Sequence, residues 1–217
     1  MQVRTLLSES GKRIADSGQR SMRTLALTAT AASMDGPDER FDVFEAARAG
    51  DRAAFEQILR QYERLVLVTA FRLLGNIEDA KDISQEVFLR LYRNLGKLDR
   101  GGDCRAWLYR VTVNLCHDAR RRRPVEAPVE ELETAPARTA DPLQAAGEAE
   151  RRMALDLSLR LLSERERAAV VLRDLEGLST QEVAHAMGTT EATVRSRVCQ
   201  ARVKMRGFLE GYFRRRS

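Results

Sequence analysis

The stretch LSTQEVAHAMGTTEATVRSRVCQARVKMR, Leu178–Arg206, predicts two helices joined by a short turn. Ser179 and Glu182 have the spacing of a capping box, which opens a helix. Gly188 follows about two turns later, where a left-handed residue would end that helix. Thr190 can then cap the second helix. Together these signals predict a helix-turn-helix.

The second predicted helix has an apolar face and a polar face. Apolar residues recur at three- and four-residue steps and are expected to face the core: Val194, Val198, Ala201, Met205 and Leu209. Polar and cationic residues fall on the other face: Thr193, Ser196, Arg197, Gln200 and Lys204. Such a helix fits the major groove of DNA and can read base edges. A solvated basic helix would have the same pattern, so this segment alone leaves both interpretations open.

Composition favours one or two soluble domains with an anionic partner. The chain has 217 residues, of which 43% are hydrophobic and 32% charged, with a net charge of +5. No run reaches the ~20 apolar residues of a membrane span, so no membrane insertion is expected. Residues 124–150 contain seven acidic residues and one basic residue, whereas both flanking regions have an excess of basic residues. Two basic blocks around an acidic spacer suit a polyanion.

Signatures of an enzyme are missing from the sequence. Cys104, Cys116 and Cys199 lack metal-type spacing and are expected to be plain thiols in a reducing cytosol. There is no phosphate-binding glycine loop and no nucleophile elbow. The sequence therefore predicts no catalytic residue, cofactor or metal site. A signal peptide is disfavoured because the apolar run Thr24–Ala32 is short, so residues 1–40 are expected to form a flexible extension.

Four helices are predicted in the first basic block, over residues 41–49, 51–74, 76–95 and 105–123, with Asp51 and Asn76 as caps. The outer face of the third is rich in carboxylates and is a candidate protein-docking surface: Asp79, Asp82, Gln85, Glu86 and Arg90. The fourth carries Arg110 and Asn114 beside Trp107 and ends in Arg120–Arg123. An aromatic, an amide and several cations along one helix can bind a nucleic acid strand. Most of the Trp107 ring is nevertheless expected to lie in the core.

Three segments resemble the extracytoplasmic-function group of bacterial RNA polymerase sigma factors: DAKDISQEVFLRLYRNL (Asp79–Leu95), CRAWLYRVTVNLCHDARRRR (Cys104–Arg123) and Leu162–Met205. The resemblance implies an all-α fold with two small helical domains joined by a flexible acidic linker. It divides the chain into an extension (1–40), domain two (41–123), a linker (124–149) and domain four (150–217). From about Leu143 the linker can join the following helix.

The resemblance also implies partners and residue roles. Domain two would bind the clamp helices of core RNA polymerase and melt the −10 promoter element, whereas domain four would bind the polymerase flap and read the −35 element. An anti-sigma factor is a further expected partner. The implied polymerase contacts are Asp79, Asp82, Gln85, Glu86 and Arg90. The implied −10 contacts are Arg100, Gly101, Trp107, Arg110, Asn114, Arg120, Arg121 and Arg122. The implied −35 contacts are Thr193, Arg195, Ser196, Arg197, Cys199, Gln200 and Arg202.

Two departures from the family pattern limit what can be carried over. Cys104 stands where the family usually has an aromatic residue, and Cys199-Gln200 stands where an aromatic or histidine followed by arginine is common. The −35 preference therefore cannot be copied from relatives. The alternatives are a stand-alone helix-turn-helix regulator, which should carry a sensor domain, and a helical adaptor. The all-helical pattern of the first block counts against the regulator.

Overall fold

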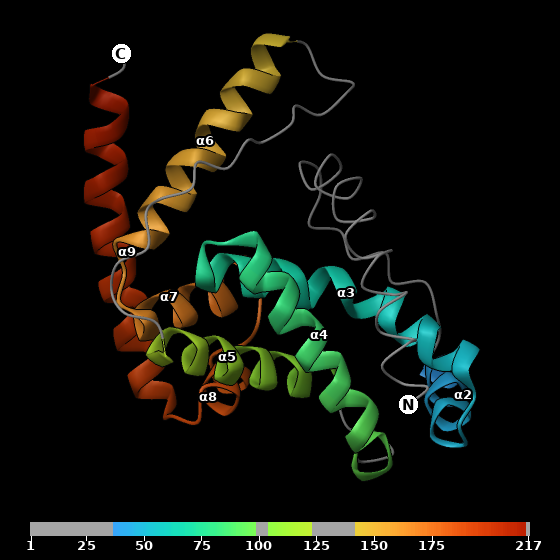
Figure 1. The fold of residues 1–217 in the computed structure, drawn as a ribbon. Coiled ribbons are helices and arrows are strands. Elements are labelled where there is room, and N and C mark those ends of the chain that lie inside the picture. Colours follow the sequence, from blue (N-terminus) through green and yellow to red (C-terminus); the bar gives the residue numbers. More distant parts are fainter. Residues whose placement is uncertain (1–36, 99–103, 123–141, 216–217) are drawn as a thin grey trace.

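The computed structural model describes residues 37–98, 104–122 and 142–215, and within these ranges all regular structure is helical. The N-terminal domain, as defined here, comprises α2 (Pro37–Arg48), α3 (Arg52–Leu74), α4 (Ile77–Asn94), the short 3₁₀ helix η1 (Leu95–Lys97) and α5 (Cys104–Arg122). The C-terminal domain comprises α6 (Pro142–Arg160), α7 (Glu164–Val170), the π-helical turn η2 (Val171–Leu175), α8 (Thr180–Ala186) and α9 (Glu191–Arg214). The predicted all-α fold is confirmed (Figure 1).

Some predicted features lie outside the described residues. These are most of the extension, the first part of the acidic linker, and Arg100 and Gly101 of the predicted −10 contacts. Helix α6 begins at Pro142, so residues 142–149 of the predicted linker are helical.

Capping residues set the bends of the N-terminal domain. Asp51 accepts hydrogen bonds from the backbone N–H groups of Ala53 and Ala54 at the start of α3. Gly75 ends α3 with a φ of 77°, a conformation that glycine adopts without steric cost. Asn76 then caps α4 directly, so the chain reverses within two residues. The caps at Asp51 and Asn76 are as predicted, and α2 begins at Pro37, four residues before the predicted start.

The predicted helix-turn-helix is confirmed in the C-terminal domain. Ser179 and Glu182 form a reciprocal capping box at α8, and Thr190 caps α9. Gly188 has a φ of 58° in the turn between these helices, as its position predicted. A second capping box, formed by Ser163 and Glu166, opens α7. These caps satisfy the backbone donors that each helix start leaves free, and so fix where α8 and α9 meet.

A continuous apolar core runs through both domains. In the N-terminal domain α3, α4 and α5 pack on one another around Ile58, Phe88 and Leu108. In the C-terminal domain α7 and α8 pack on α9 around Leu172 and Val194. The two domains also touch, because α5 packs on α8 and α3 packs on α7 and η2 (Figure 1). In the part of the chain that the structure describes, no helix could span a membrane.

Candidate nucleic-acid interface

The N-terminal half of α9 presents most of the predicted −35 contacts on an open face. Val194, Val198 and Ala201 are buried, with exposed fractions of 1%, 7% and 0%. On the far side Arg195, Ser196, Cys199 and Gln200 are exposed, whereas Thr193 and Arg197 are half-buried. Because a helix turns 100° per residue, the burial of one stripe directs the opposite stripe to solvent. This arrangement supports the prediction of a face that can enter a DNA groove.

Two of the predicted −35 cations are engaged within the protein. Arg195 forms an exposed ion pair of 3.2 Å with Glu191, one turn earlier on the same helix. Arg202 binds Asp174 of η2 through two hydrogen bonds, of 2.9 Å from Nε and 2.6 Å from a terminal nitrogen. Lys204, which the sequence placed on the polar face, binds Glu166 of α7. Arg202 and Lys204 are therefore tied to the domain that supports α9.

Helix α5 holds the predicted −10 contacts in two groups. Arg110 and Asn114 are exposed on one side, as their four-residue spacing predicts, and Arg121 and Arg122 near the end of the helix are exposed as well. Trp107 and Arg120 are half-buried, and Trp107 packs against the hydrophobic core. The core interpretation of Trp107 therefore holds for part of its ring, while the rest is accessible.

The candidate docking face of α4 is open. Asp82 is exposed, and the other predicted contacts are partly exposed: Asp79, Gln85, Glu86 and Arg90. Arg90 donates a 2.8 Å hydrogen bond to Glu86, four residues earlier. The opposite face of α4 is buried through Val87, Phe88 and Leu91 against α3 and α5. The carboxylates thus project from a helix whose opposite face is packed in the core.

Glu176 joins the two domains. One of its carboxylate oxygens accepts a 2.6 Å hydrogen bond from Arg72 of α3, and the other accepts a 3.0 Å hydrogen bond from the Tyr109 hydroxyl of α5. Arg105 adds a 3.4 Å hydrogen bond to the Glu176 backbone carbonyl. Burial raises the Tyr109 pKa well above its usual range, and the nearby negative charge of Glu176 raises it further. Tyr109 is therefore a neutral donor to Glu176 at physiological pH.

Arg167 of α7 makes the second polar contact between the domains. The residue is only 3% exposed, and its guanidinium binds backbone carbonyls, among them those of Leu159 at the end of α6 and Leu73 at the end of α3. The carbonyls at a helix C-terminus carry partial negative charge, which favours a cation there. Burial lowers the Arg167 pKa to about 10, so the group remains charged near neutral pH.

A cavity of about 340 Å³ lies between the domains, beside these contacts. It is lined by Asn114, His117 and Arg120 of α5 and by Glu164 and Arg197 of the C-terminal domain, among others. Predicted −10 and −35 contacts thus face the same small space. Cys116 also lines it, and burial raises the pKa of this thiol to about 12, so it is protonated and unreactive.

Sequence reasoning missed the residues that join the domains: Arg72, Tyr109, Arg167 and Glu176. Arg72 and Glu176 are 104 residues apart, and no local spacing marks such a pair. The one available signal was chemical, because a tyrosine within an apolar helix stripe usually has a partner for its hydroxyl.

The fold and the site define a two-domain helical protein with a helix-turn-helix, a basic helix and an acidic docking helix. The family model for Sigma-70 region 2 matches residues 58–124, and that for Sigma-70 region 4 matches residues 152–205. The chain belongs to the ECF RNA polymerase sigma factors, the promoter-directing subunits of bacterial RNA polymerase.

Several curated relatives support this membership. The ECF sigma factor SigE of Mycolicibacterium smegmatis is 38% identical over 77% of this chain and 66% of its own length. SigM of Mycobacterium tuberculosis is 34% identical over 84% of this chain and 91% of its own length. RNA polymerase sigma-H factor of Pseudomonas aeruginosa is 31% identical over 73% of this chain and 87% of its own length.

Two solved structures share the fold. CnrH, in complex with the cytosolic domain of CnrY, is 26% identical, with a TM-score of 0.56 over 79% of this chain and 97% of that one. The sigma factor RpoE of Bartonella quintana, in complex with the anti-sigma factor NepR, is 22% identical. Its TM-score is 0.59 over 72% of this chain and 96% of that one, a likeness that concerns the fold alone.

Proposed function

We propose that each of the three exposed surfaces has one task in promoter-directed initiation. The acidic face of α4 binds the clamp helices of core RNA polymerase, α5 contacts the −10 element, and α9 reads the −35 element. The proposed domain two spans residues 41–123 and domain four spans residues 150–217. The observation that carries this proposal is the open face of α9, where Ser196, Cys199 and Gln200 lie opposite the buried stripe.

The proposed −10 surface combines three kinds of contact. Asn114 is exposed and can hydrogen-bond a base that has left the stack, and the exposed edge of Trp107 can stack on one. Arg110 and the cations Arg120–Arg122 can neutralise phosphates of the melted strand. Arg100 and Gly101 complete this proposed surface from outside the described residues. A bound single strand therefore needs no catalytic group from this chain, and we infer that the chain is not itself an enzyme.

Promoter recognition requires the two domains to separate. The −10 and −35 elements lie about two turns of DNA apart, or ~70 Å at ~35 Å per turn. Asn114 and Arg197 line one cavity of about 340 Å³. A single DNA duplex cannot present both promoter elements to two residues that lie so near each other. The described arrangement is thus a closed state, and α4 is accessible to core polymerase within it.

The proposed partners follow from the same surfaces. Core polymerase and promoter DNA are the working partners, and their site of action makes the cytoplasm the proposed location. The similar structure of CnrH holds the cytosolic domain of CnrY as a protein partner, which supports a protein partner of the anti-sigma kind here also. A stand-alone helix-turn-helix regulator is the competing function, and it would bind DNA without polymerase.

Co-purification separates these functions. The full chain, carrying an affinity tag, is mixed with purified bacterial core polymerase and passed over a sizing column. A sigma factor is expected to co-elute with the core enzyme in a one-to-one complex. A chain that leaves polymerase unbound and binds promoter-length DNA tightly by itself would be a stand-alone regulator.

A further inference from the structure

Helix α9 is held from both sides of its buried stripe. At 100° per residue, Arg202 lies about 70° to one side of the centre of the stripe formed by Val194, Val198 and Ala201, and Lys204 lies about 90° to the other side. Each of these cations meets a carboxylate of a different neighbouring element. The stripe holds the helix on the domain, and the directional contacts at its two sides add to the packing that opposes rotation about the helix axis.

The contact on one side is a two-point ion pair. The Arg202 guanidinium donates to both carboxylate oxygens of Asp174, at 2.9 and 2.6 Å. Planar pairs of this kind fix direction as well as distance. The hydrogen bond to Asp174, and then the charge of Asp174, raise the Arg202 pKa above its usual range. Asp174 belongs to η2, the π-helical turn that follows α7, so this pair joins α9 to the end of that element.

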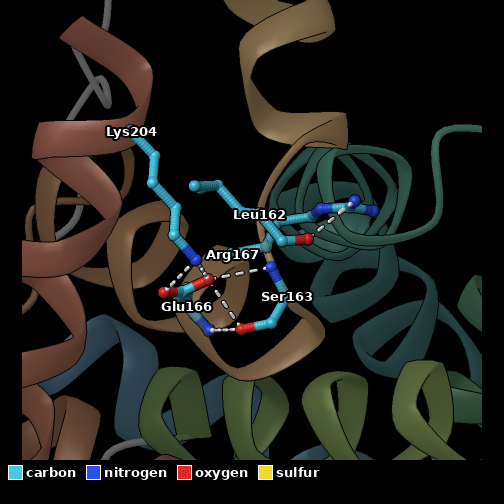
Figure 2. A network of polar contacts seen from close by, with 5 residues as sticks. All are labelled: Leu162, Ser163, Glu166, Arg167 and Lys204. Atoms are coloured by element: carbon cyan, nitrogen blue, oxygen red, sulfur yellow. Dashed lines mark hydrogen bonds and ion pairs between the residues drawn. The ribbon is translucent and has the colours of Figure 1, made fainter. Parts of the chain in front are cut away.

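The contact on the other side is built around Glu166 (Figure 2). This carboxylate is in a residue only 6% exposed, and it accepts two hydrogen bonds from the Lys204 ammonium, at 2.8 and 2.9 Å. It also accepts from the Ser163 N–H and hydroxyl in the capping box of α7. These donors, Lys204 first, lower the Glu166 pKa to about 2. One carboxylate therefore fixes the start of α7 and one side of α9.

We propose that Asp174 and Glu166 are positioning residues for −35 recognition, acting through Arg202 and Lys204 to fix the rotation of α9 about its axis. This inference rests on the proposed function and changes one part of it, because Arg202 becomes a positioning residue instead of a DNA contact. Side-chain atoms about 6 Å from the axis move by ~1 Å for a rotation of ~10°. A displacement of that size takes a base contact outside the 2.7–3.2 Å range of a hydrogen bond.

The competing role for Arg202 is a phosphate contact, with Asp174 as an internal competitor for the same guanidinium. The two roles predict opposite effects of Asp174→Asn. A freed phosphate-binding arginine would strengthen binding to every sequence and steepen the salt dependence. Loss of a positioning pair would weaken −35 reading, and base discrimination would fall most.

The test is run-off transcription by core polymerase loaded with the full chain, on a library of randomised −35 elements upstream of a fixed −10 element. Asp174→Asn and Arg202→Gln are each expected to lower −35-dependent transcription about tenfold and to flatten the base preference. The double variant should be no worse than either single variant, because all three break one pair. The exchanged pair, Asp174→Arg with Arg202→Asp, should recover most of the preference although position 202 is then an anion. Glu210→Gln is the matched control, since Glu210 lines the same groove between α9 and η2.

Stronger transcription from Asp174→Asn, or no recovery in the exchanged pair while its thermal midpoint equals that of the wild type, would overturn the inference. If the exchanged pair fails to fold, Lys204→Gln gives the second test from the opposite side of the helix, with the same expected loss of preference. A wild-type chain that supports no −35-dependent transcription would instead contradict the proposed function, and so the two failures are distinguishable.

Discussion

Replacing Glu176 with alanine should open the free protein. The substitution removes the carboxylate that bridges Arg72 and Tyr109, in a side chain only 12% exposed, and leaves the α9 face unchanged. A hydrogen bond to a charged group contributes ~1.5–3 kcal/mol. Because the Arg72 side chain is 29% exposed, the lower value of ~1.5 kcal/mol is appropriate for each bond. The two together stabilise the closed state by ~3 kcal/mol, which is ~150-fold in the closed-to-open ratio at 1.4 kcal/mol per tenfold.

Two measurements report this opening. Energy transfer between dyes at Glu78→Cys on α4 and at the exposed Cys199 on α9 should fall in the Glu176→Ala chain. The apparent Kd for a promoter fragment should fall as well, by at least ~10-fold at fixed salt. In the wild type the closed chains do not bind and so weaken the apparent affinity, and the variant has fewer closed chains. Transcription by the loaded polymerase should change little, since the proposed function has the two domains apart in that complex.

The matched control is Glu210→Ala, which removes an exposed carboxylate from α9 away from the contact between the domains. It should leave both signals at the wild-type level. Unchanged energy transfer and unchanged DNA affinity in a folded Glu176→Ala chain would refute the reasoning. The closed state would then be held by the apolar contact of α5 with α8 and not by Glu176.

Three further variants test separate surfaces. Charge reversal at Asp82 and Glu86 should abolish binding of core polymerase in a pull-down, while exposed changes of this kind shift stability by only ~0.5 kcal/mol. Gln200→Arg should move the preferred base at one −35 position from adenine towards guanine in a transcribed promoter library, because arginine pairs best with guanine. Lys204→Met should raise the pKa of Glu166 from its value of about 2 towards the ordinary 4.5. The stability difference between wild type and this variant should be full above about pH 4.5 and shrink as the pH falls towards 2, as followed by thermal unfolding.

A matched control exists for the polymerase variant, and each of the three predictions has a result that would contradict it. Lysines at the exposed α3 positions Gln57 and Gln61 add positive charge four residues apart and should spare polymerase binding. Normal pull-down by the Asp82 and Glu86 variant would remove α4 from the polymerase surface. An unaltered base profile would make Gln200 a backbone or solvent contact. A pH-independent stability difference would mean that Lys204 does not hold Glu166 ionised.

The helices could be predicted from the sequence because their caps depend on local chemistry. The contacts between residues far apart in the sequence could not be predicted in this way. Asp51, Asn76, Ser179 and Thr190 cap helices where the sequence placed them, since a cap is decided by residues within one turn. The contacts of Glu176 with Arg72 and Tyr109 join residues 104 and 67 positions apart, and no periodicity encodes them.

Contacts between distant residues also limited what could be predicted for α9. Periodicity correctly placed Val194, Val198 and Ala201 in the buried stripe of α9, whereas Met205 and Leu209 are only half-buried. Arg202 and Lys204 are exposed and flank this stripe. Only the placement of Asp174 and Glu166 by α7 and η2 decides where those cations point. The contact between the domains is a reason to expect weak promoter binding by the free chain.

Run-off transcription with core polymerase tests the central claim most directly. Core enzyme and the full chain are incubated with a library in which both promoter elements are randomised at a fixed separation of about two turns. The account predicts transcripts from a small subset of templates with defined −35 and −10 sequences, and their loss when Asn114 is changed to alanine. Transcripts that appear equally from all templates, or none from any template although the folded chain binds the core enzyme, would contradict it.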